Sequence, residues 1–152
     1  MTPEQTLASL GLTLPQLPKP VANYVPYKRV GDMLYLSGQG PRRADGSMPT
    51  GKVGRDVTTQ QAYEHAKLVG LGLLAAMRQA AGDLGKVEVI KVLGMVNGAP
   101  EFSEQPAVIN GCSDLFVAVL GENGRHARSA VGMGSLPGNM TVEVEAICRI
   151  LP

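Results

Sequence analysis

Aromatic residues and surplus charge are scarce in this chain. Aromatic residues make up 4% of its 152 residues and tryptophan is absent, which leaves few side chains on which nucleic-acid bases could stack. The formal net charge is +1, from 14 basic and 13 acidic residues that form no runs. Because nucleic acids and anionic membranes bind to clustered positive charge, both kinds of partner are disfavoured.

Cysteine is scarce as well. Cys112 and Cys148 are too few for a disulfide framework, and no Cys-x-x-Cys motif or Cys/His spacing indicates a metal site. We expect both to be small buried residues in a reducing compartment. No stretch reaches the roughly 18 apolar residues of a membrane span, and the first residues lack the basic and apolar regions of a signal peptide. These absences predict a cytoplasmic protein.

The length of the chain suits a single domain. A chain of 152 residues can bury a substantial core and no linker divides it, so one domain over residues 1–152 is expected, with 1–22 as an N-terminal arm. The arm begins with a short predicted helix, Pro3 to Leu10, and continues as an extended segment interrupted by prolines. A turn at Gly31-Asp32 then separates two strands, of which Met33 to Ser37 has the clearer pattern.

Two longer helices follow. Thr58 and Gln61 match a capping box, and apolar residues then recur at helical spacing from Ala62 to Ala80. The second helix is predicted over Phe102 to Leu120, where Pro106 is tolerated because it lies in the first turn.

Three further strands complete the pattern: Val87 to Gly98, Ala127 to Gly134, and Met140 to Ile150. The resulting order of elements predicts an α+β fold, one mixed β-sheet with two helices packed on one face. The last two strands are interpreted as neighbours inside the sheet. The second face still carries apolar side chains, and only other copies of the chain are left to cover it. A closed homo-oligomer is therefore expected.

Three segments carry a family resemblance: VGDMLYLSGQGP (30–41), VNGAPEFSEQPAVINGCSDLF (96–116) and ARSAVGMGSLPGNMTVEVEAI (127–147). With them, the chain from about Tyr24 to Ile150 resembles the YjgF/RidA family (reactive intermediate deaminase A), also labelled endoribonuclease L-PSP. The last segment is the most specific. The resemblance implies a chorismate-mutase-like homotrimer with three clefts between subunits. It also implies that active members hydrolyse enamines and imines to keto acids and ammonia.

The resemblance assigns roles to particular residues. Arg128 matches the arginine that binds the substrate carboxylate, and Glu143 matches the glutamate that holds the attacking water. Four further residues match substrate-binding positions of the family's pocket: Tyr24, Ser37, Gly38 and Asn110. Ala130 stands at a further pocket position, where the active subgroup commonly has cysteine, and Gly40 stands where a branched apolar residue is usual.

These residue types suit the implied chemistry. A 2-imino acid carries a carboxylate and an electrophilic C=N carbon, and a guanidinium can hold the carboxylate through two parallel hydrogen bonds. A carboxylate such as that of Glu143 can position or deprotonate the attacking water and pass a proton to the departing nitrogen. One arginine and one glutamate nearly suffice, so no metal or organic cofactor is expected.

Each candidate residue also has a purely structural interpretation. Arg128 could pair with Glu143 or Glu145 as a structural ion pair, or one of the glutamates could bridge subunits. Tyr24 could simply pack on a loop. Ser37 and Asn110 could be ordinary hydrogen-bonding residues of a strand end and a helix.

Three other features are interpreted as having no catalytic role. His65 lies inside a predicted helix and His126 just before Arg128, and neither has a Cys, Asp or Ser partner at a recognisable spacing. The glycine-rich segment 132–138 is neither a GxGxxG motif nor a P-loop, and a strand follows it instead of a helix, which argues against a nucleotide site.

Three classes of function remain. The first is a cofactor-free deaminase that acts on reactive enamines and imines. The second is a non-catalytic homotrimer that binds small carboxylate metabolites, such as keto acids, through Arg128. The third is a ribonuclease or translation inhibitor, which the neutral charge, the scarcity of aromatics and the lack of a histidine pair disfavour.

Overall fold

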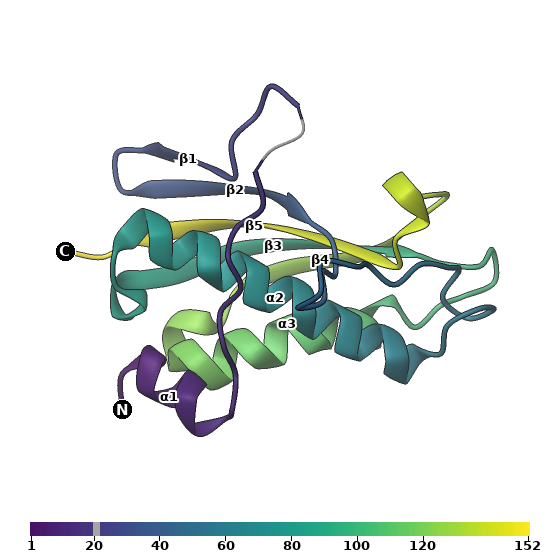
Figure 1. The fold of residues 1–152 in the computed structure, drawn as a ribbon, viewed down its shortest axis with the longest axis horizontal. Coiled ribbons are helices and arrows are strands. Elements are labelled where there is room, and N and C mark those ends of the chain that lie inside the picture. The colour runs from purple at the N-terminus through teal and green to yellow at the C-terminus, as the bar shows by residue number, and fades with distance from the viewer. Residues whose placement is uncertain (20–21) are drawn as a thin grey trace.

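A five-stranded sheet with helices on one side forms the body of the protein (Figure 1). The computed structural model describes residues 1–19 and 22–152. The helices are α1 (Pro3–Ser9), α2 (Thr59–Ala81) and α3 (Gln105–Leu120). The strands are β1 (Tyr27–Val30), β2 (Met33–Gln39), β3 (Val87–Asn97), β4 (Ala127–Met133) and β5 (Val142–Ile150). The predicted α+β order of two strands, helix, strand, helix and two strands is confirmed.

The strands lie in the order β1-β2-β5-β3-β4. Strands β3 and β4 run parallel, and every other pair is antiparallel, so the sheet is mixed, as predicted. The expectation that the last two strands are neighbours is wrong, because β3 lies between β4 and β5. The crossover through α3 places β4 beyond β3, at the edge of the sheet, and the chain then returns as β5 to the centre.

Local sequence signals explain where the helices begin and end. The Thr58 side chain accepts from the Gln61 backbone and the Gln61 side chain accepts from the Thr58 backbone, which confirms the predicted capping box of α2. The helix ends at Gly82, whose φ of 78° is in the left-handed region that favours glycine. Helix α3 begins at Gln105 instead of Phe102, with Pro106 in its first turn.

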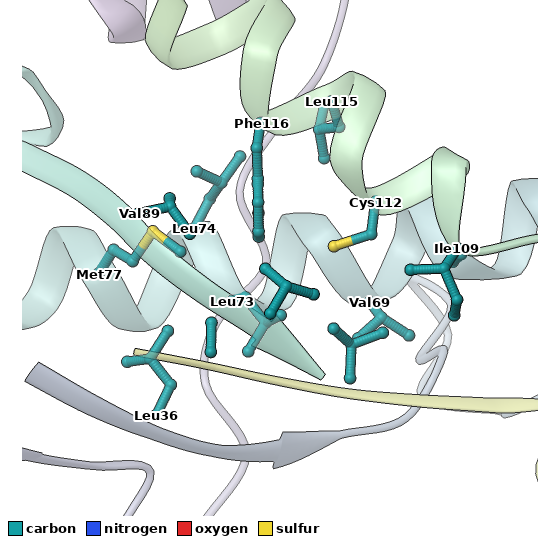
Figure 2. Packing of buried hydrophobic residues seen from close by; sticks show 14 of the residues in the cluster. Leu36, Val69, Leu73, Leu74, Met77, Val89, Ile109, Cys112, Leu115 and Phe116 are labelled. Carbon is teal, nitrogen blue, oxygen red and sulfur yellow. The ribbon is translucent and has the colours of Figure 1, made fainter. Parts of the chain in front are cut away.

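The core lies between the helices and one face of the sheet (Figure 2). Helix α3 contributes Ile109, Cys112 and Phe116 and helix α2 contributes Leu73 and Met77, all without solvent exposure. The alternation of buried and less buried residues along β5 shows which side chains face this core. The helix-facing residues of β5 are Val142, Val144, Ala146 and Cys148.

The face of the sheet opposite the helices keeps apolar side chains in solvent. We call it the open face; strand register places on it the exposed side chains of Val30, Tyr35 and Val131, which are 62%, 47% and 39% exposed. Neither helix covers them, because α2 and α3 both lie on the other side of the sheet (Figure 1). This uncovered face is the feature from which a homo-oligomer is expected.

The N-terminal arm docks on the helical side. Leu7 of α1 is 4% exposed, and the Glu4 carboxylate accepts a hydrogen bond from the backbone N–H of Leu84 (3.1 Å). The chain then runs across α2 toward β1 (Figure 1). Residues 20 and 21, part of the predicted arm, lie outside the described residues. Among the helices of the described chain, none combines the length and apolarity that a bilayer crossing requires.

Candidate functional site

Four of the predicted site residues line one cavity. Tyr24, Ser37, Gly38 and Glu143 lie around an open cavity of about 670 Å³. The residues come from the segment before β1, from β2 and from β5, which are far apart in sequence. The structure therefore brings together four of the seven site residues that the sequence predicts.

An irregularity in strand pairing places the Glu143 carboxylate. The register between β2 and β5 shifts between Leu36 and Gln39, at Ser37 and Gly38. A Cβ at Gly38 would meet the Glu143 carboxylate, so the glycine permits this close approach. Burial raises the pKa of Glu143 above its ordinary value of 4.5, and the negative charge of Glu145 raises it further. A raised pKa makes this carboxyl a stronger base than an ordinary glutamate, as a general base requires.

Ser37 connects two parts of the cavity wall. Its hydroxyl donates to the Val25 carbonyl (2.6 Å), and its backbone N–H donates to the Pro26 carbonyl (2.9 Å). These bonds hold the segment that carries Tyr24 against β2. The Tyr24 side chain remains 51% exposed.

Two methionines occupy the space beside Gly40. A Cβ added there would lie 2.6 Å from the sulfur of Met140 and 2.8 Å from that of Met48. Both methionines line the cavity next to Glu143. Flexible thioether side chains thus provide part of the apolar wall.

Arg128 lies elsewhere, between β4 and α3. Its Nη1 donates to the side-chain oxygen of Asn110 (2.8 Å) and to the hydroxyl of Ser113 (3.1 Å), which are three residues apart on α3. Ala130, two residues further along β4, packs against the main core on the same side. Arg128, Asn110 and Ala130 thus form a second group, separate from the cavity.

The two groups lie on opposite faces of the sheet. Arg128 is paired with Val92, which faces the helices, whereas Glu143 is paired with Met95 on the open face. Strand β3 also lies between the strands that carry them. The interpretation of Arg128 as the ion-pair partner of Glu143 or Glu145 within one chain is therefore wrong. Arg128 donates hydrogen bonds to Asn110 and Ser113 instead.

Sequence reasoning missed two polar neighbours of Arg128. His126 was expected to lack a serine partner, but its Nε2 lies 2.8 Å from the Ser113 hydroxyl. The serine is 13 residues earlier in the chain, on α3, so no short motif signals the pair. One local signal was available. His126 and Arg128 are two residues apart on an extended segment, which places both side chains on the same side of the chain.

The remaining polar groups suggest no metal centre. His65 bonds through Nδ1 to the hydroxyl of Thr141 (2.9 Å). In residues 1–19 and 22–152, no three side chains of the His, Cys, Asp and Glu types gather closely enough to hold a metal ion. Burial raises the pKa of the thiols of Cys112 and Cys148, which makes both poor nucleophiles.

Comparison with known proteins gives a family match over nearly the whole chain. The family model described as "YjgF/chorismate mutase-like, putative endoribonuclease" matches residues 4–149. The match begins within α1, so it includes the N-terminal arm.

Three similar proteins illustrate the match. Protein TCP17 of Trypanosoma cruzi is 41% identical over 95% of this chain and 91% of its own. The 2-iminobutanoate/2-iminopropanoate deaminase of Dermatophagoides farinae is 31% identical over 91% of this chain and 94% of its own. The crystal structure of protein Atu1372 of Agrobacterium tumefaciens, whose function is described as unknown, superposes with a TM-score of 0.90 at 49% identity. That comparison covers 98% of this chain and 94% of the Agrobacterium chain.

Proposed function

Because the chain belongs to the YjgF/chorismate mutase-like family, we propose that it hydrolyses reactive 2-imino acids to 2-keto acids and ammonia. The reaction takes place in clefts that two subunits of a homotrimer build together. The deaminase of Dermatophagoides farinae, which acts on 2-imino acids by its name, supports this choice of substrate. The two buried free thiols, Cys112 and Cys148, agree with a reducing cytoplasmic location.

One observation carries the proposal: Arg128 and Glu143 lie on opposite faces of the same sheet. Within one chain they cannot act on one small substrate. A second copy against the open face would bring its own Arg128 toward the cavity that contains Glu143. The exposed apolar residues Val30, Tyr35 and Val131 give the second copy a surface to cover.

Arg128 orients the substrate in the proposed reaction. Asn110 and Ser113 both bond to Nη1, and no hydrogen bond joins Nε or Nη2 to any described residue. The edge formed by Nε and Nη2 matches the two oxygens of a carboxylate. Binding on this edge fixes where the adjacent C=N carbon lies.

Glu143 activates water in the proposed reaction. A water held by the carboxylate attacks the imine carbon, and a C–O bond forms while the C–N π bond becomes an N–H bond. The carboxylate takes one proton from the water and passes it to the nitrogen, which gives a carbinolamine. The carboxylate then moves the hydroxyl proton of the carbinolamine to the amino nitrogen, and the C=O bond of the keto acid forms as the C–N bond breaks and ammonia leaves. Water is the single co-reactant, so neither a metal nor an organic cofactor is required. Activity is accordingly expected to survive EDTA.

The primary test is hydrolysis of 2-imino acids made in situ by an amino-acid oxidase. Semicarbazide traps whatever imine remains, so an active protein reduces the yield of semicarbazone. A yield equal to that without protein would leave the non-catalytic, carboxylate-binding homotrimer as the function.

Mixing variants tests whether the site is shared. Arg128→Ala and Glu143→Gln are each expected to be inactive as pure trimers. After unfolding and refolding together at 1:1, about a quarter of the sites would join an intact Arg128 to an intact Glu143 of the neighbouring subunit. Recovery of activity toward that level supports the shared site. No recovery in properly mixed trimers would overturn the shared site.

The ribonuclease reading of the family description finds little support in the site. His65 and His126 belong to separate hydrogen bonds, to Thr141 and Ser113, and do not form a pair that could share acid and base roles. The net charge of +1 also provides no surplus for a polyanion.

A further inference from the structure

A chain of hydrogen bonds runs from the backbone to Arg128. We infer that Ser113 and His126 are positioning residues, which hold the Arg128 guanidinium in the orientation that receives a carboxylate. The inference deepens the proposed function and rests on it for the identity of the ligand. The orientation of Arg128 itself can be measured without any ligand.

The first link fixes the form of His126. Its Nδ1 lies 2.6 Å from the carbonyl oxygen of Gly124. A carbonyl oxygen only accepts, so Nδ1 carries the hydrogen, and Nε2 of the neutral ring is an acceptor. Burial lowers the pKa of His126 below its usual 6.5, and the Arg128 charge lowers it further, although the bond to Gly124 acts in the opposite direction. The neutral ring is therefore the form at neutral pH.

The second link directs the serine. With Nε2 as acceptor, the Ser113 hydroxyl donates its hydrogen to His126 across 2.8 Å. The lone pairs of the Ser113 oxygen are then free to accept from Nη1 of Arg128, 3.1 Å away. Without His126 the hydroxyl could rotate, and the serine would no longer present a fixed acceptor.

The third link orients the guanidinium. Ser113 and Asn110 accept the two hydrogens of Nη1, which fixes the plane of the group. The free edge with Nε and Nη2 therefore has a defined direction. A side chain that is already ordered loses less entropy when it binds a ligand.

Rigid elements support the whole chain of bonds. Ser113 lies on α3, one turn before Phe116, which has no solvent exposure. The His126 ring packs edge-on against Phe116, with ring centroids 5.9 Å apart. The positions of serine and histidine are thus set by the core, while Arg128 has a long flexible side chain that needs support.

The experiment measures the mobility of the Arg128 side chain directly, in the intact 152-residue protein in its native state. Side-chain NMR reports how fast the Arg128 guanidinium rotates about its Nε–Cζ bond. Ser113→Ala and His126→Phe both interrupt the series of hydrogen bonds, and the phenylalanine keeps the packing against Phe116. His126→Gln retains an acceptor for the serine. Ser103→Ala, at an exposed position just before α3, is the matched serine control.

Both breaking variants are expected to accelerate rotation and to weaken pyruvate binding roughly 3- to 10-fold, the effect of having to order one long side chain on binding. His126→Gln is expected to restore much of both properties, and Ser103→Ala to change neither. The double variant Ser113→Ala/His126→Phe should bind pyruvate no more weakly than the more impaired of the two single variants, because both substitutions break the same series of hydrogen bonds.

The outcomes separate this inference from the proposed function. Unchanged guanidinium rotation in both Ser113→Ala and His126→Phe would overturn the positioning role, whatever the ligand results. Pyruvate binding that survives Arg128→Ala would instead contradict the proposed carboxylate site, while the rotation rates would still decide the role of Ser113 and His126. If His126→Phe fails to fold, Ser113→Ala decides by itself.

Discussion

Two glutamates on one strand face have different environments. Glu143 is half-buried beside Gly38, whereas Glu145, two residues further along β5, is exposed. Burial raises the pKa of Glu143, and Glu145 adds to the effect. The pair therefore provides a candidate catalytic residue and its own matched control.

Glu143→Gln is expected to reduce imine hydrolysis by about 10²- to 10⁴-fold, the usual contribution of general acid–base catalysis, with keto-acid affinity nearly unchanged. Glu145→Gln should leave turnover within a few-fold and shift the acidic limb of the pH–rate profile to lower pH, because it removes a charge that raises the pKa of Glu143. Steady-state rates across pH and keto-acid titrations check both. Normal turnover by folded Glu143→Gln would exclude Glu143 as the catalytic group.

Glu143→Gln is also expected to change the stability of the protein. A carboxyl whose folded pKa is raised above 4.5 costs stability as pH rises through the window from 4.5 to the folded pKa, and the cost is complete above it. Glu143→Gln removes that cost, so its melting temperature at neutral pH should rise. A decrease would indicate that Glu143 is a structural ion-pair partner across subunits.

Arg128 permits a test of geometry against charge. Arg128→Lys keeps the positive charge but loses the flat, two-pronged edge, so affinity for pyruvate or 2-ketobutyrate should fall, and Arg128→Ala should reduce it further. Calorimetric titration of both variants measures this order. Equal affinity of lysine and arginine would show that charge alone holds the carboxylate.

At the scale of elements, α2 and α3 approach each other with almost no space between them. A Cβ at Gly111 of α3 would collide with the backbone carbonyl of Tyr63 in α2, and backbone atoms cannot move aside cheaply. This close contact matters for the site, because α3 carries Asn110 next to Gly111 and Ser113 two residues after it.

Gly111→Ala is expected to reduce the free energy of unfolding by about 1–3 kcal/mol or more, as overpacking does in tight cores. Gly134→Ala is the control, since no atom lies within 4 Å of the added Cβ, and it should change stability by less than about 0.5 kcal/mol. Urea unfolding at one fixed protein concentration compares them. Equal stability of the two variants would contradict the close packing of α2 on α3.

At the scale of the whole molecule, the open face and the divided site lead to the same expectation. Its exposed apolar residues lie on the side where Glu143 projects. Covering this face and completing the site would be one event, the association of identical chains.

The protein is expected to be a homotrimer by light scattering at micromolar concentration. Val131→Lys should weaken the trimer and lower turnover, because it places a charge on the open face, which the trimer would bury. Leu10→Lys, at an exposed leucine after α1 and away from this face, should leave both unchanged. A stable wild-type monomer would remove the shared cleft, and with it the proposed division of labour between Arg128 and Glu143.

Much of the fold is predictable from local sequence signals because these act over a few residues. The capping box at Thr58 and Gln61, the turn at Gly31 and the alternation along β5 each indicate an element by short-range hydrogen bonding or side-chain period. The family segments likewise point to Arg128 and Glu143 as candidate residues. Their catalytic roles remain predictions.

The tertiary structure decided which residues meet. Strand pairing depends on contacts between distant segments, so no local pattern showed that β3 separates β4 from β5, or that Arg128 and Glu143 face opposite sides of the sheet. The bonds of Ser113 to His126 and Arg128 likewise join α3 to the start of β4 and to the residue just before it. The sequence by itself determined the elements and the candidate residues, because propensity and capping are local. Only the packing of helices on the sheet decided their partners, because burial and hydrogen bonding act between segments far apart in the chain.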